Sequence, residues 1–241
     1  MQSALYVSLS AQVALENRLT TLAGNVANAG TAGYRADEIK FDTFLSRAAN
    51  DPVNFASTGK TYISRDKGAL KQTGNDLDVA VDGEGWLAVQ TPAGLAYTRD
   101  GRMQVSADGV LQSVTGNAIL DPGGAAIIVD PDAGRISIAR DGMISQGGNV
   151  VGAIGLFHIG DNANLARRDN SGVVPDRPAT AVIDFVGEGI KQGYVEESNV
   201  NPIMEMTRLI EVTRSFEQVT QSIENSEKSL QDAIQKLGQV S

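Results

Sequence analysis

The sequence contains no cysteine and a single histidine in 241 residues. The absence of cysteine excludes disulfides, thiolate metal sites, iron–sulfur clusters and cysteine nucleophiles. His158 alone cannot build a metal site on two imidazoles, and no serine or cysteine motif accompanies it. The segment Asp130-Pro131-Asp132 lacks the ligand spacing of a calcium loop and is typical of a turn. Carboxylates occur throughout but no pair stands out, so we expect no enzyme, no catalytic residues, no metal and no cofactor.

Long apolar runs and basic clusters are also missing. The longest apolar run, residues 150–157, contains glycines and is far shorter than the roughly 20 residues that span a bilayer, so we expect no transmembrane segment. The net charge is −9, from 20 basic and 29 acidic residues, which argues against nucleic acid as a partner. The first positive side chain is Arg18, so the beginning of the chain lacks the charged start of a cleaved secretory signal.

Glycine, in contrast, is abundant: the 241 residues include 26 glycines, about one residue in nine, whereas the usual share is roughly 7%. Between about residues 76 and 196, short β-branched and apolar runs alternate with Asp-Gly and Gly-Gly pairs that suit tight hairpins. The runs are residues 78–81, 86–89, 95–98, 102–105, 127–129, 136–138 and the longer 150–159. We therefore expect a central all-β domain over residues 76–200.

The first 30 residues are predicted to form an amphipathic helix. Apolar side chains recur with 4-3-4 spacing at Leu15, Leu19, Leu22 and Val26, and the stripe extends back to Leu5. Residues 31–75 follow as a polar stretch with little periodicity, and we expect an extended connecting segment there.

A second helix is predicted over residues 201–241. Asn201 can cap its start, and Pro202 takes the first helical position, where its missing N–H costs nothing. One seam is apolar in every heptad, at Leu209, Phe216, Ile223, Leu230 and Leu237. The companion seam is mixed, at Met206, Thr213, Thr220, Glu227 and Ile234. A mixed seam favours packing among several helices over a two-stranded zipper.

Together these patterns predict an α+β protein in which long N- and C-terminal α-helices form a coiled-coil-like bundle beside a central all-β domain. The helix over residues 201–241 is expected to pair with the helix over residues 1–30. A second interpretation stays open, in which both helices pack on the β-domain of their own chain as ordinary core pieces.

Two motifs at opposite ends resemble the signatures of the bacterial flagellar rod and hook proteins. The first covers residues 24–35, Gly-Asn-Val-Ala-Asn-Ala-Gly-Thr-Ala-Gly-Tyr-Arg, and differs from the usual pattern in carrying Gly24 in place of a second asparagine. The second covers residues 193–201, Gly-Tyr-Val-Glu-Glu-Ser-Asn-Val-Asn, and leads into residues 205–217. Residues 75–86 and 97–101 also resemble the central domain of this family, so the resemblance covers nearly the whole chain.

The resemblance implies a structural subunit of the basal-body rod that polymerises through its terminal helices and transmits motor torque. It further implies export through the flagellar type III apparatus, without a cleaved signal peptide, and assembly in the periplasm with itself and with other rod subunits. The short length and the opening residues 5–10 are most similar to proximal-rod members. A distal-rod subunit and a monomeric periplasmic β-rich binding module are the alternatives, and a wall hydrolase is a third that would need a catalytic carboxylate.

The resemblance assigns roles to three sets of residues. The polymerisation helices carry Leu5, Leu15, Leu19, Leu22, Val26, Met206, Leu209, Phe216, Ile223, Leu230, Ile234 and Leu237. The turn after the first helix carries Asn25, Ala27, Asn28, Thr31, Gly33 and Tyr34. The C-terminal motif carries Gly193, Glu197, Ser198, Asn199, Val200 and Asn201. In the turn, Gly30 and Gly33 are expected to supply permissive backbone that ends the helix.

Overall fold

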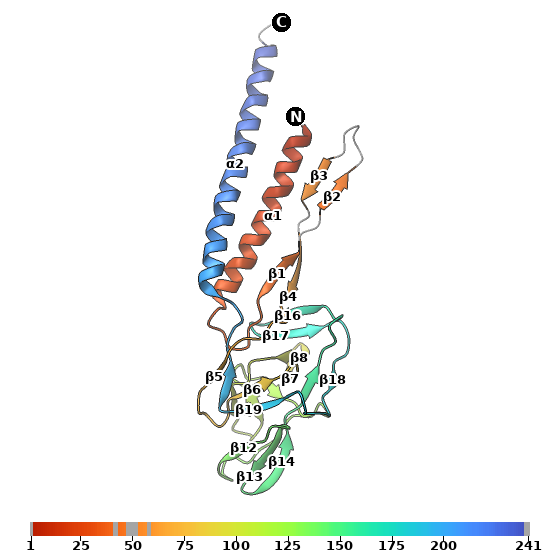
Figure 1. Ribbon diagram of the computed structural model, residues 1–241, viewed down its shortest axis with the longest axis vertical. Coiled ribbons are helices and arrows are strands. Elements are labelled where there is room, and N and C mark those ends of the chain that lie inside the picture. Colours follow the sequence, from red (N-terminus) through yellow and green to blue (C-terminus); the bar gives the residue numbers. More distant parts are fainter. Residues whose placement is uncertain (1, 41–42, 47–52, 57–58, 239–241) are drawn as a thin grey trace. The chain divides into compact units, whose positions relative to one another are not determined.

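The computed structural model describes residues 2–40, 43–46, 53–56 and 59–238, with the side chains of 2–5, 43–46, 53–56, 230, 233, 234 and 236–238 outside the description. The chain forms two compact units (Figure 1). The helical unit comprises Met1–Ala27, Asp37–Tyr62 and Asn201–Ser241. The β-rich unit comprises Asn28–Ala36 and Ile63–Val200. The expected domain boundaries at residues 30, 75 and 200 stay predictions.

The helical unit is built on two antiparallel helices that pack side by side, α1 (Gln2–Ala27) and α2 (Pro202–Gly238) (Figure 1). Asn201 caps α2 as expected, because its Oδ1 accepts hydrogen bonds from the amides of Ile203 and Met204 at 3.1 and 3.2 Å. Short strands complete the unit: β1 (Asp37–Lys40) pairs with β4 (Lys60–Ile63), and β2 (Thr43–Ser46) pairs with β3 (Val53–Ala56). Both β1 and β3 contact α1.

The prediction of a coiled-coil-like bundle is wrong. Within the described residues, the protein has one N-terminal and one C-terminal helix, packed as a single pair. The segment that returns beside α1 lacks the 3.6-residue apolar period that a third helix would need, and it forms strands instead. The pair therefore has no further helices of its own chain, in the described part, to enclose it.

The β-rich unit contains the remaining strands and four groups of pairings. The strands are β5 (Leu70–Gln72), β6 (Val79–Asp82), β7 (Trp86–Thr91), β8 (Gly94–Thr98), β9 (Met103–Val105), β10 (Leu111–Ser113), β11 (Ala118–Ile119), β12 (Ile136–Ile138), β13 (Met143–Gln146), β14 (Asn149–Ala153), β15 (Leu156–His158), β16 (Leu165–Arg168), β17 (Gly172–Pro175), β18 (Thr180–Ala181), β19 (Gly189–Gln192) and β20 (Tyr194–Glu196). The largest sheet has the order β16-β17-β8-β7-β11-β10-β9, with β15 on β7 and β18 on β15. The smaller sheets are β12-β13-β14, β19-β6 and β20-β5.

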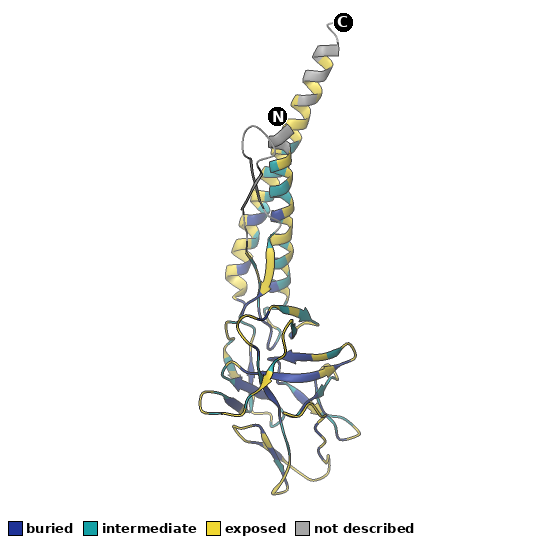
Figure 2. Ribbon diagram, turned by 90° about the vertical axis from the view of Figure 1, so that its right-hand side faces the viewer, coloured by how far each residue is buried: buried dark blue, intermediate teal, exposed yellow. Residues whose placement is uncertain are grey.

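The core of this unit is formed by apolar side chains from several of its strands, and β6 and β7 are buried over most of their length. Val79, Leu87, Leu111, Ile119 and Ile144 are completely buried. Figure 2 shows buried residues concentrated on these strands, whereas the two helices are mostly exposed or half-buried. The β-rich unit thus has the interior of an independent domain, and the helix pair does not.

Two segments differ from their expected form. Residues 150–159 form two strands, β14 and β15, because Ile154 donates its amide hydrogen to Gly142 and Gly155 donates to Leu120, in a different sheet. Residues 31–75 contain β1 to β5, whose pairings include the long-range one between β5 and β20. The partner of β5 lies more than 100 residues away, so this pairing leaves no local periodic signal in the sequence.

Candidate assembly site

The contact face of α2 follows the expected heptad seam in its first half. Leu209, Phe216 and Ile223 are half-buried along it. The second row of this face is Glu205, Val212 and Val219, of which Val212 is 5% exposed. Met206, expected in the companion seam, is instead 52% exposed. Met206 lies three residues before Leu209 and therefore beside this face, and Thr213 and Thr220 of the same companion seam are half-buried.

The facing stripe on α1 includes the expected leucines. Leu22 is buried, and Leu15, Leu19 and Val26 are half-buried. Ala14, not assigned from the sequence, is also buried, because a small side chain allows close approach of two helices. The remaining expected positions, Leu5, Leu230, Ile234 and Leu237, have side chains outside the described part of the chain.

A second set of apolar side chains points away from the seam. On α1, Tyr6, Leu9 and Val13 are 60, 51 and 37% exposed. On the first turns of α2, Ile203, Met206 and Ile210 are 75, 52 and 52% exposed. Each set follows i, i+3, i+7 spacing, so each forms one stripe on its helix. We call these the outer stripes. Clustered apolar surface of this kind marks an interaction site.

A buried polar node ties the end of α1 to β1 and to α2. The side-chain amide of Asn25, which is 3% exposed, donates to the Asp37 carbonyl and accepts from the Asp37 amide, both at 2.9 Å. Its Nδ2 also donates to Glu205 Oε2 at 3.3 Å. Glu205 in turn binds Arg208 at 2.6 Å. Asn25, identified from the motif, therefore pairs with β1 as another strand would.

After Ala27 the chain makes the expected turn. The Thr31 amide donates to the Asn28 carbonyl at 3.0 Å, and its hydroxyl bonds Asn28 Oδ1 at 3.1 Å. Gly33 has a φ of 66°, the left-handed region that favours glycine. Gly30 does not have a positive φ, so of the two expected glycines only Gly33 needs its permissive backbone.

The turn and the C-terminal motif fold against each other within the β-rich unit. The Gly33 amide donates to the Glu196 carbonyl at 2.8 Å, and the Asn199 amide donates to the Tyr34 carbonyl at 3.3 Å. Asn199 also accepts from the Ala36 amide at 2.7 Å and donates to the Asp66 carbonyl at 2.8 Å. Two motifs separated by about 160 residues in the sequence therefore form one structure.

The other motif residues of this region have local roles. Gly193, with a φ of 80°, accepts amide hydrogen bonds from Thr73 and Gly74. Ser198 accepts from the Val200 amide at 3.2 Å, and Val200 is buried. Glu197 forms an exposed ion pair with Lys71 at 3.3 Å.

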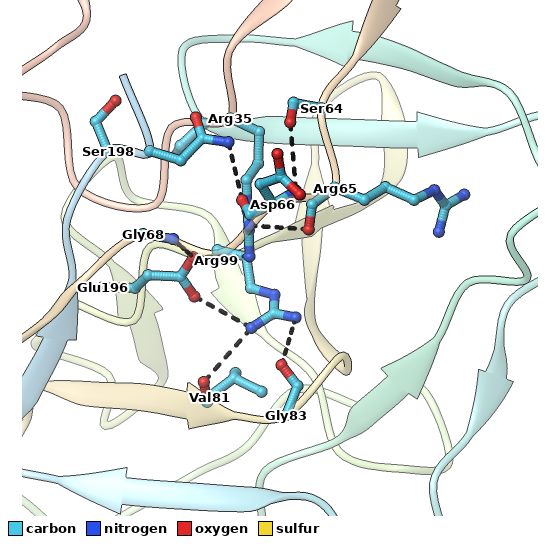
Figure 3. Close-up of polar contacts among 12 residues, drawn as sticks. Arg35, Ser64, Arg65, Asp66, Gly68, Val81, Gly83, Arg99, Glu196 and Ser198 are labelled. Carbon is cyan, nitrogen blue, oxygen red and sulfur yellow. Dashed lines mark hydrogen bonds and ion pairs between the residues drawn. The ribbon is translucent and has the colours of Figure 1, made fainter. Parts of the chain in front are cut away.

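At the centre of this structure lies a buried cluster of Arg35, Arg99 and Glu196 (Figure 3). Arg35 Nη2 is 2.7 Å from Glu196 Oε1, and Arg99 Nη1 is 3.1 Å from Oε2. Gly68 donates its amide hydrogen to Oε1 at 3.0 Å. All three charged side chains are at most 2% exposed. The carboxylate thus bridges two cations in the interior of the unit.

Backbone carbonyls around the arginine–glutamate cluster accept further hydrogen bonds, although Nε of Arg35 and Nε of Arg99 have no hydrogen-bond partner among the described residues. Arg35 donates to the Arg65 carbonyl at 3.1 Å, and Arg99 donates to the Gly83 carbonyl at 2.9 Å. Both guanidinium groups lie over the ring of Trp86, at 5.7 and 5.2 Å from its centroid. Burial lowers the pKa of Arg35 to about 10, against the opposing effect of Glu196, so the side chain stays charged at neutral pH. Burial also lowers the pKa of Arg99.

None of these three residues was assigned a role from the sequence, although each stands inside a motif. Arg35 ends the first motif, Glu196 lies in the second, and Arg99 lies in the segment 97–101. The available signal was that each motif carries at least one charged residue. Only the fold shows that the three segments meet, because no local spacing relates them.

Gly33 and Gly30 offer a matched pair of substitutions. A Cβ at Gly33 would lie 2.2 Å from the backbone nitrogen of Asp100, whereas a Cβ at Gly30 meets nothing within 4 Å. We expect Gly33→Ala to destabilise the β-rich unit by at least about 3 kcal/mol, because backbone strain adds to a clash with main-chain atoms. Gly30→Ala should change stability by less than about 1 kcal/mol. Urea unfolding followed by the fluorescence of Trp86 measures the stability of both variants. Equal unfolding midpoints would contradict the conclusion that Gly33, and not Gly30, requires glycine.

Comparison with known proteins follows the two motifs. Residues 5–35 match the family description "Flagella basal body rod protein", residues 80–146 match "Flagellar hook protein FlgE/F/G D1 domain", and residues 191–236 match "Flagellar basal body rod FlgEFG protein C-terminal". The flagellar basal-body rod protein FlgF of Mesorhizobium japonicum is 48% identical over 238 residues, 99% of each chain. The chain belongs to the flagellar basal-body rod protein family. FlgF of Rhizobium meliloti is 44% identical over 99% of each chain.

Members named FlgG are less similar to this rod protein. FlgG of Bacillus subtilis is 28% identical, over 97% of this chain and 98% of its own. The resemblance inferred from the motifs is therefore confirmed, and the rod protein is of the FlgF type. It is a structural subunit of the flagellar basal body, and it assembles with other rod and hook proteins. Within its described residues, neither helix is apolar over enough of its length to cross a membrane.

Proposed function

We propose that this rod protein is a proximal-rod subunit that polymerises through α1 and α2 and so transmits motor torque. The observation that carries the proposal is the pair of outer stripes. They leave Tyr6, Leu9, Ile203, Met206 and Ile210 in water although the seam between the helices is already filled. Removing apolar surface from water contributes about 25 cal/mol per Å², so covering both stripes favours association.

The positions of the two outer stripes favour an assembly that extends by the addition of successive subunits. One stripe lies on the first half of α1 and the other on the first turns of α2, and the two helices are antiparallel (Figure 1). The stripes therefore lie toward opposite ends of the helix pair. Contact between unlike patches of successive subunits is heterologous, and such contacts extend an assembly instead of closing it. The β-rich unit, with its own core, adds rigid mass to this framework.

The proposal includes the route to the rod. The chain passes the flagellar type III export apparatus without a cleaved signal peptide and assembles in the periplasm. Its role is mechanical, with no catalytic step. Export unfolded is compatible with a chain that has no cysteine, because no disulfide has to form before or after passage.

The experiment is a double substitution in the outer stripe of α2, Ile203→Asp with Ile210→Asp. Both side chains are more than half exposed, so we expect the isolated protein to keep its helical content and its unfolding midpoint. Incorporation into basal bodies should fall by at least about tenfold, because charges replace apolar contacts between subunits. Ser222→Asp with Ser229→Asp, also exposed and seven residues apart on α2, is the matched control. Normal incorporation and motility of the stripe variant would refute the proposal.

A further inference from the structure

The two most exposed large apolar side chains of the described chain lie in one loop of the β-rich unit. Ile183 is 93% and Val186 is 84% exposed, in the connection between β18 and β19. Their neighbours Val182 and Phe185 pack on the core. The Val182 amide donates to the Leu156 carbonyl at 2.8 Å, which fixes the base of the loop. The loop therefore holds two branched side chains in water.

The tip of this loop also carries a charge. Asp184 lies between the two apolar side chains and is exposed, and its Oδ1 accepts the Val186 amide hydrogen at 3.0 Å. That bond sets the local backbone and leaves the other carboxylate oxygen available. We call Ile183, Asp184 and Val186 the loop tip. A tip held in one conformation loses little entropy on binding.

A pocket elsewhere on the same unit has the complementary character. Its volume is about 490 Å³, within the roughly 300–1,000 Å³ typical of pockets that bury a ligand. The exposed Pro92, with Val89 and Ala96, which are 4 and 1% exposed, forms its apolar wall, and the turn between β16 and β17 forms another side of it. Several hydroxyl groups of the lining already have partners, as in the 2.8 Å bond between Ser113 and Thr115. Its walls are thus largely satisfied and can take apolar side chains.

Four charged side chains line the pocket, and they are not equivalent. Asp100 and Arg102 form an ion pair at 2.7 Å and neutralise each other. Arg168 is half-buried and has no ion-pair partner among the described residues. Asp169, with a φ of 54°, is exposed and remains hydrated. The charge that gains most from a partner is therefore Arg168, because it has lost part of its water without receiving an anion.

Combining these observations, we infer that the loop tip of one copy of this chain inserts into the pocket of the next copy in the rod. Ile183 and Val186 lie against the apolar wall, and Asp184 pairs with Arg168. The inference rests on the proposed function, since it requires copies to be stacked. It adds a contact between β-rich units to the contact between helices. Tip and pocket are different surfaces of one chain, so the contact repeats from copy to copy without closing.

The absence of cysteine makes crosslinking a direct test. In the double variant Ile183→Cys with Asn170→Cys, the introduced thiols are the only ones in the chain, and Asn170 lies on the exposed rim of the pocket. The full chain replaces the native one in motile cells, and isolated basal bodies are oxidised. We expect a ladder of dimers and larger species on a non-reducing denaturing gel. Ile128→Cys with Asn170→Cys, in which residue 128 is 66% exposed, is the control and should give none.

The outcomes separate the inference from the function on which it rests. If the variant is present in basal bodies without a ladder, or with only an intramolecular disulfide, the inference is overturned and the rod function stands. If neither the native chain nor the variant is found in basal bodies, the rod function itself fails, and the inference with it.

A charge exchange tests the pairing of Asp184 with Arg168. Either Arg168→Glu or Asp184→Lys should lower the crosslinking yield by about tenfold or more, because like charges then meet in the contact. The two exchanges together should restore most of the yield. Asp184→Asn keeps the bond to the Val186 amide and removes only the charge, so it should lower the yield less than Asp184→Lys. An unchanged yield in Arg168→Glu, or no restoration in the combined variant, would contradict this pairing.

Discussion

Replacing Glu196 by alanine is expected to lower the free energy of unfolding of the β-rich unit by about 3–5 kcal/mol. The carboxylate lies between Arg35 and Arg99, and the substitution leaves two buried cations facing each other without an anion. It also removes the acceptor of the Gly68 amide. Loss of one partner from a buried ion pair costs far more than the net contribution of the pair, because the remaining charge cannot regain water.

The measurement is urea unfolding monitored by the fluorescence of Trp86, the single tryptophan, whose ring lies beneath both guanidinium groups. Glu197→Ala is the control at the adjacent position. Glu197 pairs with Lys71 at the surface, where an ion pair contributes at most about 1 kcal/mol. Glu196→Gln keeps a hydrogen-bond acceptor but removes the charge. Its loss of unfolding free energy should lie between those of Glu196→Ala and Glu197→Ala. Similar midpoints for Glu196→Ala and Glu197→Ala would show that the cluster does not hold the unit together.

Placing aspartate at both Phe216 and Ile223 is expected to abolish incorporation into basal bodies and motility. These side chains are half-buried in the seam between α1 and α2, and two carboxylates there would be partly removed from water without partners. The helix pair should separate. The β-rich unit has a core of its own, so its free energy of unfolding should change by no more than about 0.5 kcal/mol.

Circular dichroism of the purified chain should show lost helix in this seam variant, and fluorescence of Trp86 should show an intact β-rich unit. Gln218→Asp with Asn225→Asp places the same two charges, seven residues apart, on exposed positions of α2 and serves as control. Motile cells carrying the seam variant would refute assembly through the helices. The seam and outer-stripe variants differ in one respect: only the first should disturb the isolated molecule.

Local patterns were reliable wherever one element carried its own signal. The heptad at Leu209, Phe216 and Ile223 gave the contact face of α2, and Asn201 with Pro202 gave its first turn. The prediction of a helical bundle from the same pattern was wrong. A periodic apolar stripe indicates that one face of a helix is covered, but it does not indicate how many helices cover it. Met206, expected in the companion seam, is 52% exposed, whereas Thr213 and Thr220 of that seam are half-buried, so the role of Met206 stays a prediction.

The motifs located the important region but not its chemistry. Asn25, Gly33 and Asn199 could be identified one by one, but only the fold shows that Asn25 bonds Asp37 and that Asn199 bonds Ala36. The pairing of Arg35 with Glu196 could not, because the two residues lie 161 positions apart and share no periodic relation.

From the residues alone came the terminal helices and the central β-structure, which follow from near-neighbour preferences: apolar spacing, capping and hairpin glycines act over a few residues. Composition gave the lack of thiol chemistry, and the resemblance of the two motifs to known signatures gave the family. The fold decided which charges are buried together, which apolar side chains remain in water and which glycine needs a positive φ. These properties depend on which distant segments of the chain exclude water from each other. The sheets and the helix pair must pack before that water is excluded.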